Sequence, residues 1–562
     1  MEDVLVIIHA EDIPVAERLV ASLPSYRVYT FDPVLVDLIA MSKLKNMQFI
    51  PWQDGLPYAD LERRAREAAR QVEQVLDAAL RQVAPGLAMQ SWQYLQLHFL
   101  FIIVWWYAAL WDRVVGTLAG TKVHVFLYER PADLYFNSFL PALLLMQCLS
   151  RHAIAFAAYP YGDEPEPNER VPDLRGRHLA DNNETLLAHL PTCFYDIYYF
   201  NQEMQASGKQ FLNLAARKFD MPVFAQRSLG LIALDEVREQ LGEERWRQAE
   251  LFAETAALHL DKLLEPFIGT AAYRSRQVHW LAGNYKAQWV TYQLLQSYFA
   301  QTQPAKMLLS DHDMGLHGPL IAFARERQIP VVLLPHSKTS YECPYDYEQL
   351  VALTHPIQGA PIYGPSGKRV MSHLLDYPET LQAQTAVGGP LQRVGLLLNA
   401  LSYDGIYCTN YDVYFDGIRR IIQWSKDRNI SLRIRCKPSY SVVGLLALMG
   451  VDADPLIRDY TMPLQEFAAS CDICLMYGAP TSGAIDFLTT GAPLLNPAPI
   501  RLTGWEASMM DVAIVAREEI EDCLARLDSF CADPVNLHAF KREQFIAYVS
   551  AFAGARPLRC FL

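Results

Sequence analysis

The chain has 562 residues, of which 51% are hydrophobic and 20% are charged, so it can bury a large core and is long enough for at least two domains. This composition excludes an intrinsically disordered chain. The net charge of −13 and the lack of a long Lys/Arg run argue against binding along a nucleic-acid backbone, whereas a small nucleotide remains compatible.

The N-terminal segments alternate between strand and helix patterns. VLVIIHA predicts a buried strand, IPVAERLVASL a helix, and YRVYTFD and MQFIPWQ two further strands. Two long helices are expected over 57–83 and 91–118, and then KVHVFLY and AIAFAAYP resume the strands. This order is typical of a doubly wound α/β domain.

The acidic N-terminus, MEDVLVIIHAED, carries no basic region of the kind that opens a signal peptide, and the 10 cysteines are scattered. We therefore expect a cytoplasmic, reducing setting without structural disulfides. Cys471 and Cys474 form a Cys-x-x-Cys motif that overlaps an expected strand. Because no second pair of this kind accompanies it, two buried core cysteines are favoured over a metal or redox site.

The most apolar segment is FLFIIVWWYAALW, Phe99–Trp111, which is flanked by His98 on one side and by Asp112 and Arg113 on the other. It is shorter than the roughly 20 apolar residues that cross a bilayer, so a buried helix is favoured. The second interpretation is an aromatic surface patch that docks on a membrane or on a lipid-linked acceptor. The expected location is therefore the cytoplasm, either free or associated with a membrane surface.

The rest of the chain predicts more α/β structure. A largely helical insert is expected over about 183–301, followed by the strand, helix and strand of AKMLLSD, GPLIAFARERQI and PVVLLPHS. From about residue 388 the strand and helix patterns begin again and continue to the late helix EEIEDCLARLDSF. We expect two Rossmann-like doubly wound domains, 1–387 with the insert and 388–562. The carboxyl ends of their parallel strands would face a central cleft, where ligands are expected.

The segment YGAPTSGAIDFLTTGAPLL, Tyr477–Leu495, predicts a turn between a buried strand and a helix. Small residues from Gly478 onward let the backbone approach a ligand, and the start of a helix offers unpaired N–H groups. The hydroxyls of Thr481 and Ser482 suit a phosphate, and Asp486 could accept hydrogen bonds from ribose hydroxyls. The structural alternative is a plain helix cap made by Thr481 or Ser482.

The strand SLRIRCKP places Arg433, Arg435 and Lys437 on one face, because side chains in a strand repeat every two residues. An edge strand with a solvated face would explain the two arginines. Lys437 lies at the carboxyl end, beside Ser439 and Tyr440, where a donor phosphate would be held.

Asp311, His312 and Asp313 follow the strand AKMLLS and are also expected at a carboxyl strand end. Transfer of a sugar by direct displacement needs a general base for the acceptor hydroxyl, and we favour Asp311 or Asp313 for this role, with His312 and His336 as further candidates. A metal-binding Asp-x-Asp is the weaker alternative, and an aspartate that only caps the following helix is the structural one.

The order of motifs over about 305–530 resembles the GT-B nucleotide-sugar glycosyltransferases, especially those that build bacterial surface glycans. The motifs are the strand and His336 of IPVVLLPHS, Gly389 in VGGP, the basic-Pro turn of RCKPSYS, and the small-polar turn before Asp486. The chain departs from the family where it has Lys437–Pro438 in place of the common His-Pro, and Asp486 in place of the usual Glu. A histidine that acts as an acid on the leaving phosphate is therefore not supported.

The resemblance implies an inverting glycosyltransferase whose first domain binds a glycan, lipid-linked or protein acceptor and whose second domain binds the nucleotide-sugar donor. It implies no cofactor, no required divalent metal and no nucleic-acid partner. DHDMG is loosely similar to a motif of bacterial sialyltransferases, so a CMP-activated acidic sugar stays open as the donor. The alternatives are a sugar-nucleotide epimerase of the same fold and a non-catalytic scaffold for glycan assembly.

Overall fold

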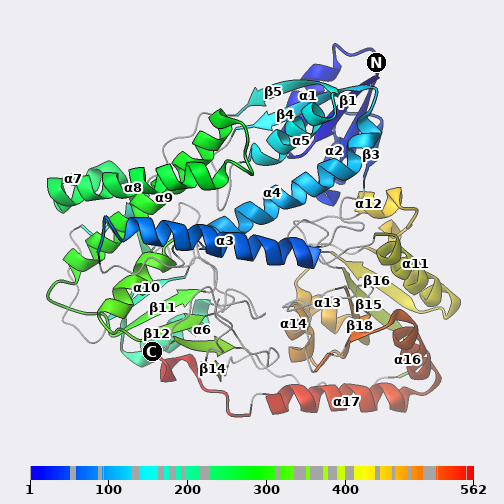
Figure 1. Ribbon diagram of the computed structural model, residues 1–562. Coiled ribbons are helices and arrows are strands. Elements are labelled where there is room, and N and C mark those ends of the chain that lie inside the picture. The colour runs from blue at the N-terminus through cyan, green and yellow to red at the C-terminus, as the bar shows by residue number, and fades with distance from the viewer. Residues whose placement is uncertain are drawn as a thin grey trace.

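The computed structural model describes most of the chain, and its helices and parallel strands confirm the predicted α/β class (Figure 1). The described residues are 2–50, 58–85, 92, 94–129, 138–162, 170–175, 185–190, 197–214, 228–310, 315–334, 350–354, 371–376, 389–398, 411–436, 443–457, 462–478, 483–497, 514–515, 517–551 and 553–562.

The first sheet has five parallel strands in the order β3-β2-β1-β4-β5. Its strands are β1 (Glu2–Ile7), β2 (Tyr26–Thr30), β3 (Met47–Phe49), β4 (Thr121–Tyr128) and β5 (Ala155–Tyr161), and its connecting helices are α1 (Asp12–Val20), α2 (Pro33–Met41) and α5 (Leu140–Arg151). Val4–Ile7 is fully buried, as the apolar run of β1 requires for a strand covered on both faces. The predicted βαβ start of the chain is confirmed.

The second sheet has seven strands, and three of them lie in the segment that we expected to be largely helical. Its order is β14-β13-β12-β11-β7-β8-β9. The strands are β7 (Thr185–His189), β8 (Gln210–Leu214), β9 (Ser228–Leu229), β11 (Lys306–Ser310), β12 (Val331–Leu334), β13 (Leu350–Thr354) and β14 (Met371–Leu374). A separate antiparallel pair joins β6 (Arg170–Pro172) to β10 (Leu231–Ala233).

The expectation for 183–301 is correct for its helices and wrong for β7–β9. The helices are α6 (Ile197–Ser207), α7 (Arg238–Leu241), α8 (Glu243–Leu264) and α9 (Ala271–Tyr298). The sequence of β7, TLLAH, is buried at all five positions, so it shows no alternation, and a short apolar run of this kind does not separate a strand from a helix. The first predicted domain, 1–387, thus contains two parallel sheets.

The third sheet has the order β16-β15-β17-β18-β19 and begins just after the predicted boundary at residue 388. Its strands are β15 (Arg393–Leu398), β16 (Ser431–Arg435), β17 (Ile473–Tyr477), β18 (Leu494–Pro497) and β19 (Arg517–Glu518). Its helices are α11 (Tyr411–Asp427), α12 (Val443–Leu448), α13 (Leu464–Ala469), α14 (Gly483–Thr489), α16 (Ile520–Ala532) and α17 (Pro534–Ala551). β16 is an edge strand, as its arginines suggested.

A layer of long helices joins the first sheet to the second. It contains α3 (Tyr58–Leu80), α4 (Tyr94–Val114), α8 and α9, and α9 also packs against α10 (His317–Glu326). In Figure 1, α3 and α4 cross the middle of the molecule, and α8 and α9 run beside them.

The apolar helix α4 lies within this layer. The segment Gln96–Leu118 is long and apolar enough to cross a membrane, but 56% of its most apolar window is buried inside the protein. Two of its aromatic side chains are packed in the interior: Phe101 meets Phe267 edge to face, and Trp111 donates a hydrogen bond to the Pro141 carbonyl at 2.9 Å. This packing favours the interpretation of a buried core helix.

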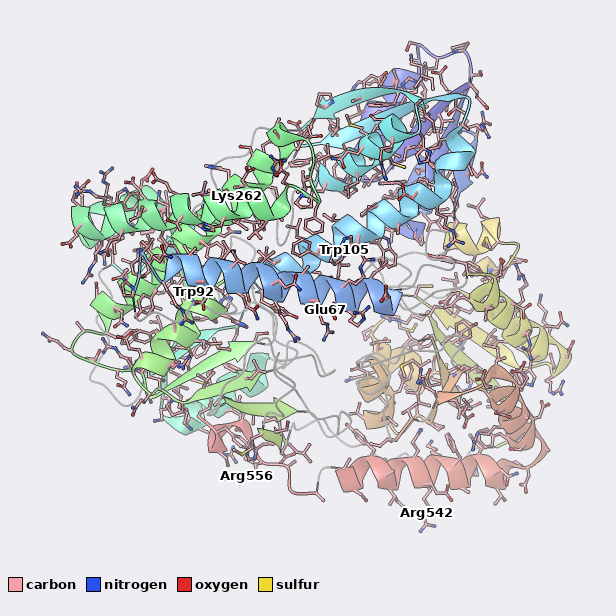
Figure 2. All side chains as sticks on the ribbon, viewed as in Figure 1. Glu67, Trp92, Trp105, Lys262, Arg542 and Arg556 are labelled. Carbon is pink, nitrogen blue, oxygen red and sulfur yellow. The ribbon has the colours of Figure 1, made fainter. Side chains whose placement is uncertain are left out.

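The C-terminal residues return from the third sheet to the second. Figure 2 labels Arg542 on α17 and Arg556 on the segment beyond it, next to the second sheet. Leu558 and Phe561 are buried in a cluster with Leu186 and Phe200. The Arg559 guanidinium pairs with the Glu203 carboxylate on α6 at 2.7 Å. The two C-terminal sheets are therefore linked by the end of the chain as well as by the connection before β15.

The packing of α3 on α4 generates a pH-dependent prediction. His98 on α4 stacks on Tyr94, and burial, together with Arg66 and Arg70 on α3, lowers the pKa of His98 to about 3. The unfolded chain binds this proton near the usual pKa of about 6.5, so stability falls as the pH drops below that value. Between about pH 7 and about pH 5, the free energy of unfolding should fall by about 2 kcal/mol more for the natural chain than for His98→Phe. Urea unfolding at both pH values measures this change in the free energy of unfolding. An equal decrease in the two proteins would show that His98 is not buried in its neutral form.

Candidate functional site

Each parallel sheet has one place where two neighbouring strands lead into connections that run in opposite directions. These switch points lie between β1 and β4 in the first sheet, between β7 and β11 in the second, and between β15 and β17 in the third. Ligands of open α/β sheets bind at such a point, outside the carboxyl ends of the strands. The second and third switch points coincide with segments that the sequence had marked as functional.

At the third switch point, the structure contains the predicted strand and helix. β17 is buried at all five positions and ends at Tyr477. Gly478 follows it with φ of 101°, a backbone conformation that favours glycine, and α14 begins at Gly483. The turn itself, with Thr481 and Ser482, lies outside the described residues.

The start of this turn is held by Asn496, a fully buried side chain on the neighbouring strand β18. With the amide nitrogen facing the turn, Asn496 donates to the Met476 carbonyl at 2.7 Å and to the Gly478 carbonyl at 2.9 Å. Both acceptors are main-chain groups at the end of β17. A single side chain thus fixes the direction in which the chain leaves the sheet.

A buried positive charge lies next to the turn. Arg435, the last residue of β16, is only 8% exposed, and its guanidinium donates to the Met462 carbonyl at 2.9 Å. Burial lowers the pKa of Arg435, and the carboxylate of Asp486, in the first turn of α14, acts in the opposite direction. The two side chains are therefore close enough to sense each other's charge. Gly478 directly follows β17 and Asp486 lies in the first turn of α14, and their roles in donor binding stay predictions.

At the second switch point, two buried histidines meet. His189 ends β7, His317 begins α10, and their rings lie edge to face with centroids 5.6 Å apart. The Nδ1 atom of His189 lies 2.8 Å from the Leu214 carbonyl, which can only accept, so Nδ1 carries a proton and donates it to this hydrogen bond. Within the described part of the chain, the Nε2 atom of His189 is buried and has no hydrogen-bond partner.

Helix α10 is fixed at its start by contacts from α9 and from Trp92. Gln288 donates one amide nitrogen to the Trp92 carbonyl at 3.0 Å and to the Gly315 carbonyl at 2.7 Å. A methyl group at Gly318 would lie only 2.6 Å from the Trp92 ring, so glycine is required there. The residues that flank the acidic segment 311–314 are thus held from both the sheet and the helical layer.

Several predicted site residues lie outside the described part of the chain, and for them the roles stay predictions. They are Asp311, His312, Asp313, His336, Lys437, Ser439, Tyr440, Thr481 and Ser482. Their strands are described: β11 ends at Ser310, β12 at Leu334 and β16 at Arg435, so each segment begins at a carboxyl strand end, as expected.

Gly389 is not placed with the other predicted donor-binding residues. It precedes the amino end of β15 and is exposed, whereas Gly478 follows the carboxyl end of the parallel neighbour β17. The two glycines therefore lie at opposite edges of the third sheet. The Gly-Pro signal of VGGP marks a turn into the strand, and the sequence could not show which edge that turn occupies.

Three residues of these sites were missed by the sequence analysis. His189 was not considered as a residue at a strand end, because the segment that contains β7 was expected to be helical. His317 stands in the quoted acidic segment but was passed over for its neighbours. Asn496 could have been noticed as a polar residue that ends the apolar strand LLN, since a buried amide needs partners.

The Cys-x-x-Cys pair is buried, as predicted. Cys474 is fully buried on β17, Cys471 lies just before that strand, and a hydrogen bond from Cys474 lowers the pKa of Cys471 to about 7. A methyl group at Gly395 would lie 2.9 Å from one sulfur and 3.0 Å from the other. Both thiols therefore fill the space above this glycine of β15 and belong to the core.

No family model matches the chain, and no curated protein matches its sequence. Among solved structures, the glycosyltransferase SnogD from Streptomyces nogalater is 14% identical over 65% of this chain and 95% of its own, with a TM-score of 0.34. MurG from Acinetobacter baumannii is 10% identical over 67% and 96%, with a TM-score of 0.35. The UDP-GlcNAc 2-epimerase of Methanocaldococcus jannaschii, in complex with UDP-GlcNAc and UDP, is 7% identical over 62% and 92%, with a TM-score of 0.31. Scores at this level carry no argument about the function of this chain.

The role of Asn496 can be tested by a change that keeps its shape and removes its donor. In Asn496→Asp, a carboxylate would face the Met476 and Gly478 carbonyls, and the loss of these two hydrogen bonds should lower the free energy of unfolding by roughly 1–3 kcal/mol. Asn536→Asp on α17 is the matched control, because its exposed amide also donates to a carbonyl. Urea unfolding measures the free energy of unfolding of both variants. An equal decrease in the two variants would contradict the role of Asn496.

Proposed function

We propose that this protein is a glycosyltransferase that moves a sugar from a nucleotide-activated donor to a hydroxyl group of an acceptor. The observation that carries the proposal is the arrangement at the third switch point. There, the buried strand β17 leads into Gly478, the short helix α14 begins at Gly483, and the carboxylate of Asp486 acts electrostatically on the buried Arg435. The order of motifs noted in the sequence supports the same function.

The donor is proposed to bind at the carboxyl edge of the third sheet. Small residues after Gly478 allow the backbone to approach the nucleotide closely, and Thr481 and Ser482 offer hydroxyl donors to a phosphate. Lys437 follows the end of β16 by two residues and would neutralise the negative charge of the leaving phosphate. Asp486 would accept hydrogen bonds from the ribose hydroxyls.

The acceptor is proposed to bind at the carboxyl edge of the second sheet. Asp311 or Asp313, directly after β11, would take the proton from the acceptor hydroxyl while its oxygen forms a bond to the anomeric carbon of the donor sugar. The bond from that carbon to the phosphate oxygen breaks in the same step, so the configuration inverts. His312 and His336 are the other candidates for the base. His189 is paired with Leu309 near the end of β11 and would position the segment that follows this strand.

The finer identity of the substrates follows from chemistry rather than from a bound ligand. Direct displacement needs no divalent metal, because Lys437 and main-chain donors would stabilise the leaving phosphate. The proposed acceptors are a surface glycan, a lipid-linked saccharide or a protein. A CMP-activated acidic sugar is one candidate donor, and UDP- and GDP-sugars are the others.

Release of free nucleotide from CMP-, UDP- and GDP-sugars, with and without acceptor, tests the proposal. Acceptor-dependent release is expected for the natural chain. Asp311→Asn or Asp313→Asn should lower turnover by roughly 100- to 10,000-fold, because base catalysis contributes an effect of that size. The donor dissociation constant, measured by calorimetry, should stay nearly fixed, since the carboxylate acts on the acceptor.

Asp522→Asn, an exposed aspartate in the first turn of α16, is the control and should keep full turnover. Conversion of a nucleotide sugar into its epimer without acceptor would support an epimerase, and no reaction with any donor would support a scaffold. Normal turnover in both Asp variants would exclude both carboxylates as the base and would direct the same test to His312 and His336.

A further inference from the structure

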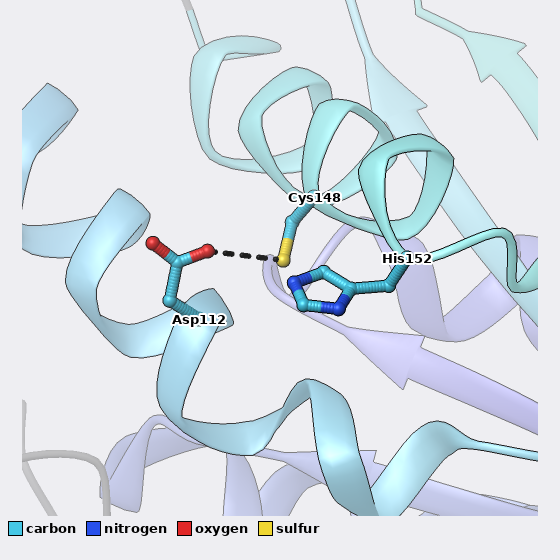
Figure 3. A group of neighbouring side chains, drawn as sticks. All are labelled: Asp112, Cys148 and His152. Atoms are coloured by element: carbon cyan, nitrogen blue, oxygen red, sulfur yellow. Dashed lines mark hydrogen bonds between the residues drawn. The ribbon is translucent and has the colours of Figure 1, made fainter.

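A group of three metal-binding side chains lies on the first sheet's side of the protein, where the sequence had indicated no site. Asp112 near the end of α4, Cys148 on α5 and His152 directly after α5 each offer a ligand atom, and these atoms all lie within 4.8 Å of one another. Figure 3 shows the three side chains converging on one point between the two helices. They provide one oxygen, one sulfur and one nitrogen.

Two of the ligands come from consecutive turns of one helix. Cys148 and His152 are separated by four residues, so both side chains lie on the same face of α5. The Cys148 sulfur is buried and already donates to the Asp112 carboxylate at 3.5 Å, while Asp112 and His152 approach from the solvent side. The carboxyl end of α5 also carries a partial negative charge, which favours a cation there.

The neighbouring Arg151 does not block the site. Its guanidinium lies 2.9 Å from one oxygen of Asp112. The side chain of Arg151 is 59% exposed and that of Asp112 is 50% exposed. An exposed pair of this kind contributes little to stability. Arg151 contacts Oδ1 of Asp112, the same oxygen that accepts from Cys148. Because both charged side chains are exposed, Arg151 would turn away to solvent and leave the carboxylate to the metal.

We propose that Asp112, Cys148 and His152 bind a divalent metal ion of the zinc class. A thiolate, an imidazole and a carboxylate are the ligands that Zn²⁺ takes in proteins, and water would complete a four-coordinate site. Binding would replace the thiol proton of Cys148, which leaves to solvent, with the metal.

The position of the group indicates a structural role for this ion. α5 carries the chain back from the carboxyl end of β4 to the start of β5 at Ala155, and α4 leads into the start of β4 at Thr121. The ends of both helices therefore lie at the amino edge of the first sheet, opposite its switch point. The ion would join α4 to α5 without taking part in chemistry at the carboxyl edges.

Titration of the metal-stripped full chain with Co²⁺, a coloured substitute for Zn²⁺, tests the proposal. We expect one equivalent to produce a thiolate-to-cobalt charge-transfer band that Zn²⁺ then abolishes, and Zn²⁺ to raise the thermal unfolding midpoint. His152→Gln removes an exposed ligand without touching the core. It should weaken Zn²⁺ binding by more than about 100-fold, since changes to groups around a metal ligand already weaken it roughly 10- to 100-fold.

The controls separate this site from the other thiols and histidines of the chain. His279→Gln, at an exposed position on α9, and Cys471→Ala, in the Cys-x-x-Cys pair, should keep both the band and the stabilisation. Cys148→Ala should lose the band, and His152→Gln serves in its place if that variant does not fold. A missing band at one equivalent, or a band that persists in His152→Gln, would overturn the proposal.

Discussion

The parallel pairing of β15 with β17 is the constraint on which the proposed donor site depends. Residues 394–398 of β15 pair with 473–477 of β17, so the two strands end together, and their connections then leave in opposite directions. In open α/β sheets, a divergence of this kind marks the place where ligands bind. Asn496 then fixes the exit of the chain at Gly478, and Arg435 brings a buried positive charge to the same edge. The second sheet repeats the arrangement between β7 and β11, where His189 and His317 meet.

Much of the fold was predictable because its strands and helices carry strong local patterns. The fully apolar run of β1, the helices α3 and α4, and the strand–turn–helix at 473–489 were all recognised from the sequence. The seven-stranded sheet was not, because β7 and β8 are short strands that precede the long helices α8 and α9. A five-residue apolar run has no period that distinguishes a buried strand from a turn of buried helix. The partner of β7 is β11, more than a hundred residues later, and such a pairing leaves no mark in the local sequence.

The candidate site was predictable where function places polar or small residues directly after a buried strand. Gly478 directly follows the buried strand β17, and Asp486 lies in the first turn of the next helix, α14. Gly389 shows the limit of this rule, because the sequence around a glycine next to a strand does not tell whether the glycine precedes or follows that strand. Asn496 shows another limit, because its importance comes from two carbonyl groups on a different strand. The metal-binding group was invisible for a similar reason: Asp112 lies far from Cys148 along the chain, and the spacing becomes meaningful only when α4 packs against α5.

Hydrogen exchange of the full chain, with and without CMP, UDP or GDP, tests the central claim most directly. The account predicts that at least one of these nucleotides slows exchange of the main-chain amides from the end of β17 through α14, residues 476–489. Amides at the edge of the first sheet, residues 7–12, should keep their rates. Protection confined to residues 7–12 would place the nucleotide at the first switch point and would contradict the account, as would unchanged exchange with all three nucleotides.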